Sequence, residues 1–187
     1  MGIFGIIFRR DAATNAARAL YATAVARARE TVFYTDFGTP DTVDGRFELV
    51  AIHVFLLIRR LDRGDVDDVR LAQQLFDHMF DDMEINLREM GVGDPGIGKK
   101  IKRMAQGFHG RANAYEAGLT GEAGQLEEAL RRNLYGTTEP MSSQIQAVAA
   151  YVRREAAALD RMDPAALLRG RHAFGTLAHM PGPPDRT

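Results

Sequence analysis

Residues 41–90 read DTVDGRFELVAIHVFLLIRRLDRGDVDDVRLAQQLFDHMFDDMEINLREM, and this stretch decides the fold. Within residues 49–58 the single polar side chain is His53, and a helix that is apolar on every side is typical of a buried position. The apolar segment, residues 44–61, has roughly 18 residues, whereas a bilayer span needs about 20. We therefore predict a buried core helix and not a membrane span.

The second half of the same stretch supplies the cover for this helix. After a turn at Asp62-Arg63-Gly64, apolar side chains recur every three or four residues, which predicts a long amphipathic helix; they are Leu75, Phe76, Met79, Phe80, Met83, Leu87 and Met90. Gly91 follows the pattern as a natural helix end. Because a short turn joins the two helices, we predict an antiparallel hairpin at the centre of the fold.

Helical periodicity also predicts the remaining elements. Helices are expected over residues 11–30, 94–118, 126–135, 138–159 and 164–170, with an irregular aromatic loop at 31–39. No stretch alternates apolar and polar residues for long enough to form a strand. The sequence predicts an all-α, single-domain bundle of about seven helices over residues 11–170, followed by a disordered tail at 171–187.

Three glycines lie inside the helix that Asp94-Pro95 opens. Gly98, Gly107 and Gly110 each cost about 1 kcal/mol relative to alanine in a helix interior. We expect such glycines where another backbone approaches closely.

Composition excludes several kinds of chemistry. The chain has 24 basic and 25 acidic residues, so its total charge does not indicate nucleic acid or an anionic membrane as a partner. It has no cysteine, which excludes disulfides, thiolate metal sites and a cysteine nucleophile. No glutamate is followed by histidine three residues later, as a di-iron bundle requires. We predict that the chain is not an enzyme and holds no metal or cofactor.

The first ten residues, MGIFGIIFRR, allow two placements. They can dock on the body of the protein. Alternatively they form a weak interfacial membrane contact in which the apolar side chains enter the acyl boundary and the arginines reach the headgroups; this contact would use Ile3, Phe4, Ile6, Ile7, Phe8, Arg9 and Arg10.

Two further features leave functional alternatives open. His53 is most simply a core histidine bonded to a backbone carbonyl, but it also allows a haem or lipid carrier with a pocket beside it. Lys99, Lys100, Lys102 and Arg103 open a helix and allow an RNA- or anion-binding module. The nearby GDPGIGKK resembles a phosphate-binding loop but lacks the final Ser or Thr and follows a helix, which excludes nucleotide hydrolysis.

Several motifs together resemble a known family. They are Phe33-Tyr34 before Gly38-Thr-Pro, then TVDGRF, HVFLLIRRL, the block LFDHMFDDMEINLREMGVGDPGIGKKIKRMAQGFHGRANAY, and ALRRNLY. The pattern covers about residues 15–135 and resembles the ubiquinol–cytochrome c chaperone family, with residues 81–102 the most specific part. Members are helical, non-enzymatic assembly factors for cytochrome b of the cytochrome bc complex.

The resemblance implies a client, a location and a surface. The client is newly made cytochrome b. Because no long N-terminal anchor or transit sequence is present, the chain resembles the bacterial members, which implies the cytoplasmic face of the inner membrane. The small partner and the ribosome used by mitochondrial members stay open, as does the oligomeric state. The implied partner surface comprises Asp81, Asp82, Asn86, Arg88, Gly91, Gly98, Lys99, Lys102, Arg103 and Tyr115.

Overall fold

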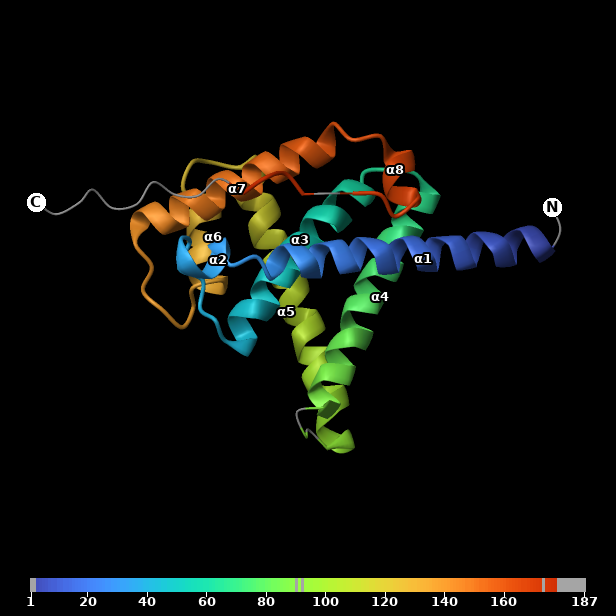
Figure 1. Cartoon of the computed structure of the whole chain (residues 1–187), viewed down its shortest axis with the longest axis horizontal. Coiled ribbons are helices and arrows are strands. Elements are labelled where there is room, and N and C mark those ends of the chain that lie inside the picture. Colours follow the sequence, from blue (N-terminus) through green and yellow to red (C-terminus); the bar gives the residue numbers. More distant parts are fainter. Residues whose placement is uncertain (1–2, 90, 92, 173, 178–187) are drawn as a thin grey trace, which may run out of the picture.

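A computed structural model describes residues 3–89, 91, 93–172 and 174–177 of the chain, and this part is all helical, without a strand (Figure 1). The all-α prediction is confirmed. Eight helices are present in the described residues, one more than predicted: α1 (Ile3–Ala28), α2 (Val32–Thr35), α3 (Val43–Leu61), α4 (Val66–Glu89), α5 (Asp94–Thr120), α6 (Gln125–Asn133), α7 (Ser142–Asp160) and α8 (Pro164–Leu168).

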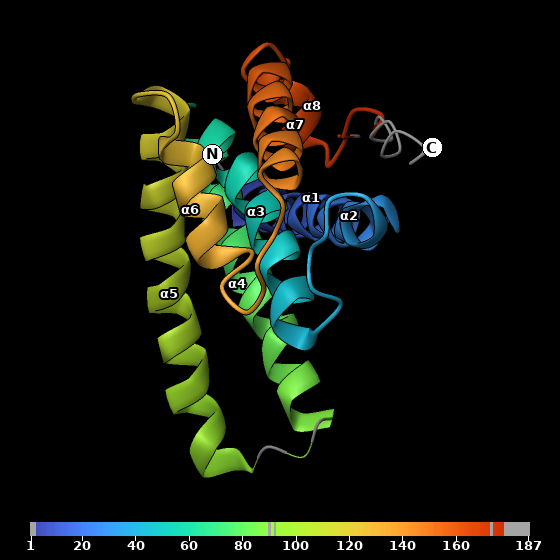
Figure 2. The same ribbon diagram turned by 90° about the vertical axis from the view of Figure 1, so that its left-hand side faces the viewer.

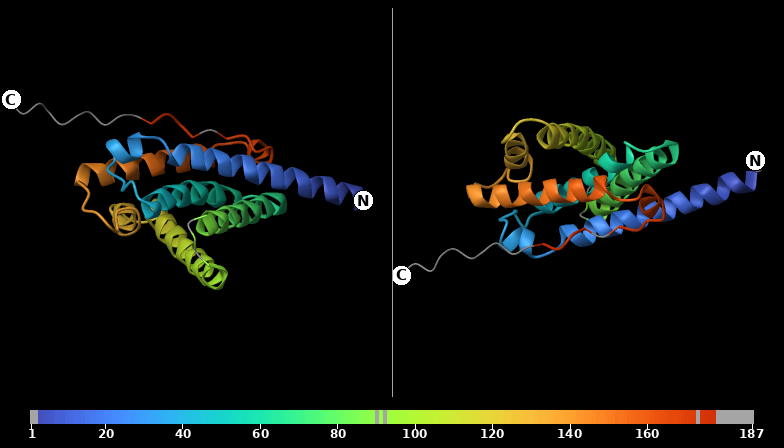
Figure 3. Two further views of the ribbon diagram at one scale, coloured as in Figure 1. Left: turned by 60° about the horizontal axis from the view of Figure 1, so that its bottom comes forward. Right: turned by 90° about the horizontal axis from the view of Figure 1, so that it is seen from above.

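Helix α3 occupies the centre of the fold. Every side chain over residues 49–57 is buried, as predicted for a helix that is apolar on all sides. Thr42 caps its start by accepting a hydrogen bond from the backbone N–H of Gly45 at 3.1 Å. Helices α1, α4, α5 and α7 all contact α3, and Figure 3 shows α1 and α7 both extending along the long axis of the molecule.

Helix α4 takes part in two hairpins. It returns along α3 after the turn at 62–65, which confirms the predicted antiparallel pair. It then pairs with α5 through the turn near Gly91, a residue with a left-handed φ of 81° that favours glycine. Figures 1 and 2 show the joined ends of α4 and α5 extending away from the remaining helices, and we call this pair the α4–α5 hairpin.

Helix α1 begins earlier than predicted. The expected boundary near residue 10 is absent, because one continuous helix runs from Ile3 to Ala28. Its first turns reach beyond the other helices in Figure 1. The side chains of residues 3–12, which include the predicted membrane-contact residues, lie outside the described part of the structure.

The glycine interpretation is wrong for α5. No described atom lies within 4 Å of the Cβ position at Gly98 or Gly110, and at Gly107 the position meets only the guanidinium of Arg111. The close approach occurs at Gly118, whose Cβ position would lie 2.5 Å from Cα of Leu126. Helices α5 and α6 can touch there because Gly118 has no side chain.

Part of the predicted disordered tail also differs from the expectation, whereas residues 173 and 178–187 of that tail lie outside the described structure. Phe174, in the region predicted to be disordered, is only 5% exposed. Gly175 donates its backbone N–H to the carboxylate of Glu155 at 2.9 Å, and Arg27 and Arg154 donate to carbonyls of this segment. We call residues 174–177 the C-terminal strap.

The segment 31–39 was predicted to be an irregular aromatic loop, but it contains a short helix, α2, and Phe33 and Phe37 are buried.

Candidate partner-binding groove

A cavity of about 740 Å³ lies where the α4–α5 hairpin leaves the body of the protein. We call it the hairpin groove. Its walls come from the ends of α1 and α4, the starts of α3 and α5, and the segment after α6. Its apolar lining includes Val25, Phe47, Met83, Leu87 and Met104. This volume lies within the range of about 300–1,000 Å³ that is usual for ligand sites.

The start of α3 shapes one edge of the hairpin groove. A side chain at Gly45 would collide with the backbone carbonyl of Pro40, so glycine lets the loop before α3 pack tightly against the helix. Val43, in the first turn, is left 63% exposed and faces the groove. Val43 thus adds exposed apolar surface to this edge of the groove.

A hydrogen bond fixes α4 against α1 in one wall. The hydroxyl of Tyr21 donates to Oδ2 of Asp82 at 2.7 Å, and the amide of Asn86 donates to the same carboxylate at 3.2 Å. Burial and the neighbouring Asp82 carboxylate raise the pKa of Tyr21 well above its ordinary value, so the hydroxyl stays protonated as the donor.

An ion pair fixes α5 against α3 in the opposite wall. Arg111 reaches Glu48 through two of its nitrogen atoms, with Nε at 2.7 Å from Oε2. Glu48 is 5% exposed, and burial raises the pKa of its carboxyl, although Arg111 opposes the rise. The guanidinium also lies 6.0 Å from the centre of the Phe47 ring. Both charges are therefore satisfied within the protein.

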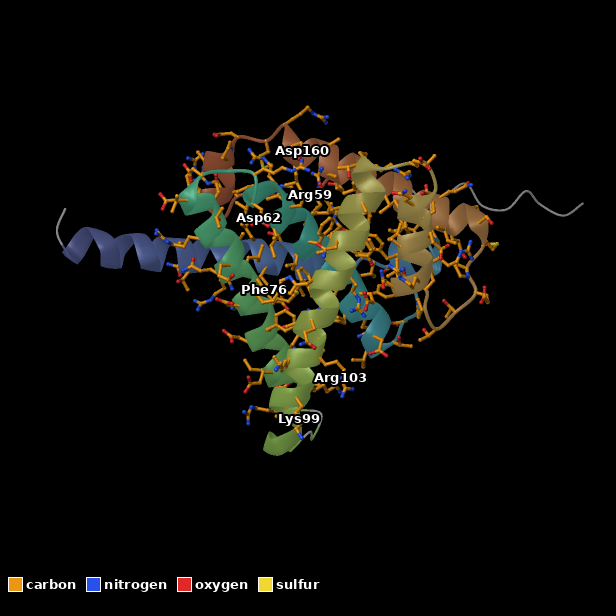
Figure 4. The ribbon with its side chains drawn as sticks, turned by 180° about the vertical axis from the view of Figure 1, so that it is seen from behind. Arg59, Asp62, Phe76, Lys99, Arg103 and Asp160 are labelled. Carbon is orange, nitrogen blue, oxygen red and sulfur yellow. The ribbon has the colours of Figure 1, made fainter. Side chains whose placement is uncertain are left out.

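The rim carries cations that have no such partner. Arg29 follows α1, and Lys100 and Arg103 extend from α5; Figure 4 labels Arg103 one turn above Lys99. None of Arg29, Lys100 and Arg103 forms an ion pair with a residue that the structure describes. Arg46, which also lines the groove, bonds to Asp41 at 2.6 Å. The rim thus presents three positive charges that are free to meet a partner.

The structure brings together only some of the residues predicted for the partner surface. Asp82, Asn86 and Arg103 line the hairpin groove. The others on the α4–α5 hairpin are exposed outside its lining: Asp81, Arg88, Gly91, Gly98, Lys99 and Lys102.

Tyr115 was predicted for the partner surface, but its side chain is buried in the core. It is 1% exposed and packs against Phe55 at 5.6 Å between ring centres, because its face of α5 turns toward α3. Sequence reasoning missed Arg29, Val43, Phe47 and Arg111. The TVDGRF motif contains two of them, Val43 and Phe47, and the longer family block contains Arg111, but neither motif singled these residues out.

His53 lies apart from the groove, in the core. Its Nδ1 is 2.6 Å from the carbonyl oxygen of Leu49, which can only accept, so Nδ1 carries the proton. Nε2 then accepts from the hydroxyl of Tyr151 at 2.7 Å. Burial lowers the pKa of His53 to about 3, which keeps the ring neutral. Both ring nitrogens are used by the protein, which supports the core interpretation.

The described residues contain neither a metal cluster nor a membrane-spanning helix. No group of three or more His, Asp or Glu side chains in the described residues is arranged to hold a metal ion. No helix in the same part of the chain has the length and hydropathy needed to cross a bilayer.

The fold and the groove define a class of protein. An all-helical body that holds open a groove with an apolar lining and a charged rim is typical of a protein that binds another polypeptide. The sequence supports a narrower assignment, because residues 35–174 match the family described as ubiquinol-cytochrome C chaperone. The chain belongs to this family. The assignment favours the chaperone interpretation over the RNA-binding and carrier alternatives.

Individual relatives agree with the family assignment. The chain is 24% identical over 153 residues to ubiquinol-cytochrome-c reductase complex assembly factor 1 of Xenopus laevis, covering 82% of this chain and 76% of the frog protein. It is 27% identical over 146 residues to the mitochondrial protein CBP3 of Saccharomyces cerevisiae, covering 76% of this chain but only 44% of the yeast protein. The crystal structure of the Cbp3 homolog from Brucella abortus superposes with a TM-score of 0.82 and 32% identity, covering 94% and 98% of the two chains.

Proposed function

We propose that this chain is a non-enzymatic assembly chaperone that binds newly made cytochrome b and promotes assembly of the ubiquinol–cytochrome c reductase complex. Relatives in frog and other animals carry the name of assembly factors for this complex. The observation that carries the proposal is the hairpin groove, since it offers an apolar lining to a client whose own apolar segments need cover before they enter the membrane.

The groove's construction suits a holding function. The Tyr21–Asp82 bond and the Glu48–Arg111 pair brace its two walls from inside the protein. Met83 and Met104 in the lining are unbranched and adapt to varied partner shapes. A braced frame with an adaptable lining lets one site hold an unfolded segment without requiring one fixed side-chain arrangement.

Deleting the gene tests the function directly. We expect the level of assembled cytochrome bc complex to fall while other respiratory complexes keep their levels, and unchanged levels of this complex would refute the proposal.

Complementation of the deletion strain with variants then tests the role of the groove. Met104→Gln, which adds a polar group to the lining, should restore less complex than Met141→Gln, an equally conservative change at a 63% exposed methionine outside the groove.

We further propose that the start of α1 makes the protein peripheral to the cytoplasmic face of the membrane. The apolar side chains would enter the headgroup boundary while two arginines meet lipid phosphates; the residues are Ile3, Phe4, Ile6, Ile7, Phe8, Arg9 and Arg10. Flotation with anionic liposomes should fall when residues 1–10 are removed. Equal flotation of both proteins would contradict this contact.

A further inference from the structure

The charge inside the hairpin groove is unevenly balanced. Glu48 is paired with the cation of Arg111, whereas the carboxylate of Asp82 accepts hydrogen bonds from the neutral groups of Tyr21 and Asn86. Of the acidic side chains in the lining, only Asp44 has no described hydrogen-bond or ion-pair partner, whereas Arg29, Lys100 and Arg103 all lack one. The groove therefore offers excess positive charge to whatever enters it.

These cations stand next to the apolar lining rather than apart from it. Lys100 and Arg103 precede Met104 on α5, and Arg29 follows Val25 and Ala28 near the end of α1. A segment that lies in the groove thus meets apolar side chains along its floor and positive charge along its edges. The volume of about 740 Å³ accommodates a short segment, not a folded domain.

We propose that the hairpin groove selects a short amphipathic segment of the client that carries Asp or Glu side chains. The carboxylates lie against Arg29, Lys100 and Arg103, while the apolar face rests on the lining that includes Met83 and Met104. This inference rests on the proposed function and adds the chemical type of the segment that is held.

The test uses the purified full chain and fluorescent peptides that tile the whole sequence of cytochrome b. Binding is measured by fluorescence anisotropy at low and at physiological salt. We expect the tightest peptides to be apolar segments that contain acidic residues, and replacing these by Gln or Asn should weaken binding about tenfold. This magnitude corresponds to two or three exposed charge pairs. Binding should also weaken as salt rises.

Variants of the protein give the matching half of the test. The double variant Arg29→Gln/Arg103→Gln should bind the acidic peptides about tenfold more weakly. Arg18→Gln is the control, because Arg18 is exposed on α1, the helix that precedes Arg29, but lies outside the lining. It should change binding less than twofold. Circular dichroism melts establish that each variant is folded.

Charge reversal makes the assignment specific. Arg103→Glu should bind the acidic peptides weakly, and peptides with Lys in place of Glu should regain affinity for that variant only. Equal binding of acidic and amide peptides, or equal binding by the double variant and the Arg18→Gln control, would overturn the inference.

Two outcomes separate this inference from its foundation. If the double variant restores cytochrome bc complex fully in the deletion strain, the selection of acidic segments is wrong while the chaperone function stands. If the groove cations prove necessary for binding anionic phosphatidylglycerol vesicles but not for any peptide, the groove is a lipid site and the inference is overturned.

Discussion

Polar side chains have different surroundings in the core around α3 and on the α4–α5 hairpin. In the core, His53 has both nitrogens bonded, to Leu49 and Tyr151. On the hairpin side, Lys100 and Arg103 meet solvent without a described ion-pair partner. A buried polar group that loses its partner costs stability, whereas an exposed charge costs little. The groups that stabilise the fold and the proposed binding site thus lie in different regions.

Helix α3 connects the two regions. Its middle, residues 49–57, is buried in the core, whereas its first turn lines the hairpin groove through Val43 and Gly45. Glu48 stands at the boundary, buried but paired with Arg111 from α5. The groove is therefore fixed to the buried central helix of the protein, while its rim cations are exposed. The following predictions test this division.

The largest difference is expected for apolar truncations. Leu57→Ala removes a fully buried side chain of α3 and should lower the free energy of unfolding by about 4 kcal/mol. Ile85→Ala, at a 55% exposed position of α4, should change it by less than about 0.5 kcal/mol. Urea denaturation measures both, and similar losses at the two positions would contradict the division.

Breaking the pair at the boundary should cost somewhat less. Arg111→Met leaves Glu48 buried without its partner and should destabilise the protein by about 3 kcal/mol. The matched change is Arg70→Met, which breaks an exposed pair with Asp67 on α4 and should cost less than about 0.5 kcal/mol. Thermal and urea unfolding of the two variants gives the comparison; an equal cost would show that Glu48 is not effectively desolvated.

Removing single tyrosine hydroxyls should change the free energy of unfolding more in the core than beside the groove. Tyr151→Phe deprives Nε2 of His53 of its donor in the core and should cost about 2 kcal/mol. Tyr34→Phe removes a bond to the carbonyl of Ala28 beside the groove, where water can replace it, and should cost less than about 1 kcal/mol. A larger loss for Tyr34→Phe would reverse the assignment of rigid and open regions.

The smallest effect, counted per pH unit, is a pH dependence of stability. The pKa of His53 in the folded protein is about 3, below its ordinary value of 6.5. Between these two pH values, the unfolded chain therefore binds a proton at His53 and the folded chain does not. Stability from this group is complete above pH 6.5 and is lost as pH falls toward 3, by up to about 1.4 kcal/mol per pH unit.

Comparison with His53→Gln isolates this contribution, since His172, whose pKa is also lowered by burial, titrates in both proteins. Urea denaturation between pH 7.5 and 4.5 should give a steeper loss for the native chain than for the variant. Parallel curves would show that His53 is accessible to protons in the folded state.

The core was predictable from sequence because its signals are local. The apolar run at residues 49–58 and the spacing of Leu75, Met79 and Leu87 specify burial within one or two helix turns. The groove was not predictable in this way. Arg111 and Glu48 stand 63 residues apart, and Tyr21 and Asp82 stand 61 apart, so only the packed structure brings them together.

Two other differences have the same origin. Tyr115 and the apolar residues of α5 share one periodic face, which identifies a core side but does not tell a partner from the protein's own α3. Phe174 lies in a stretch without helical periodicity, yet it is buried because the side chains around His53 leave space for its ring, 4.8 Å away. Complementary space in the folded protein has no local signature in the sequence.

The C-terminal strap also determines when the protein becomes complete during its synthesis. Arg27 of α1 bonds to the carbonyl of Phe174, 147 positions later in the chain, and Phe174 closes the core over His53. A ribosome releases α1 long before it releases the strap, and contacts between distant positions form late. Part of the surface of α1 therefore stays uncovered until residues 174–177 have left the ribosome, so that this assembly factor itself depends on a distant segment of its own chain before it can serve another.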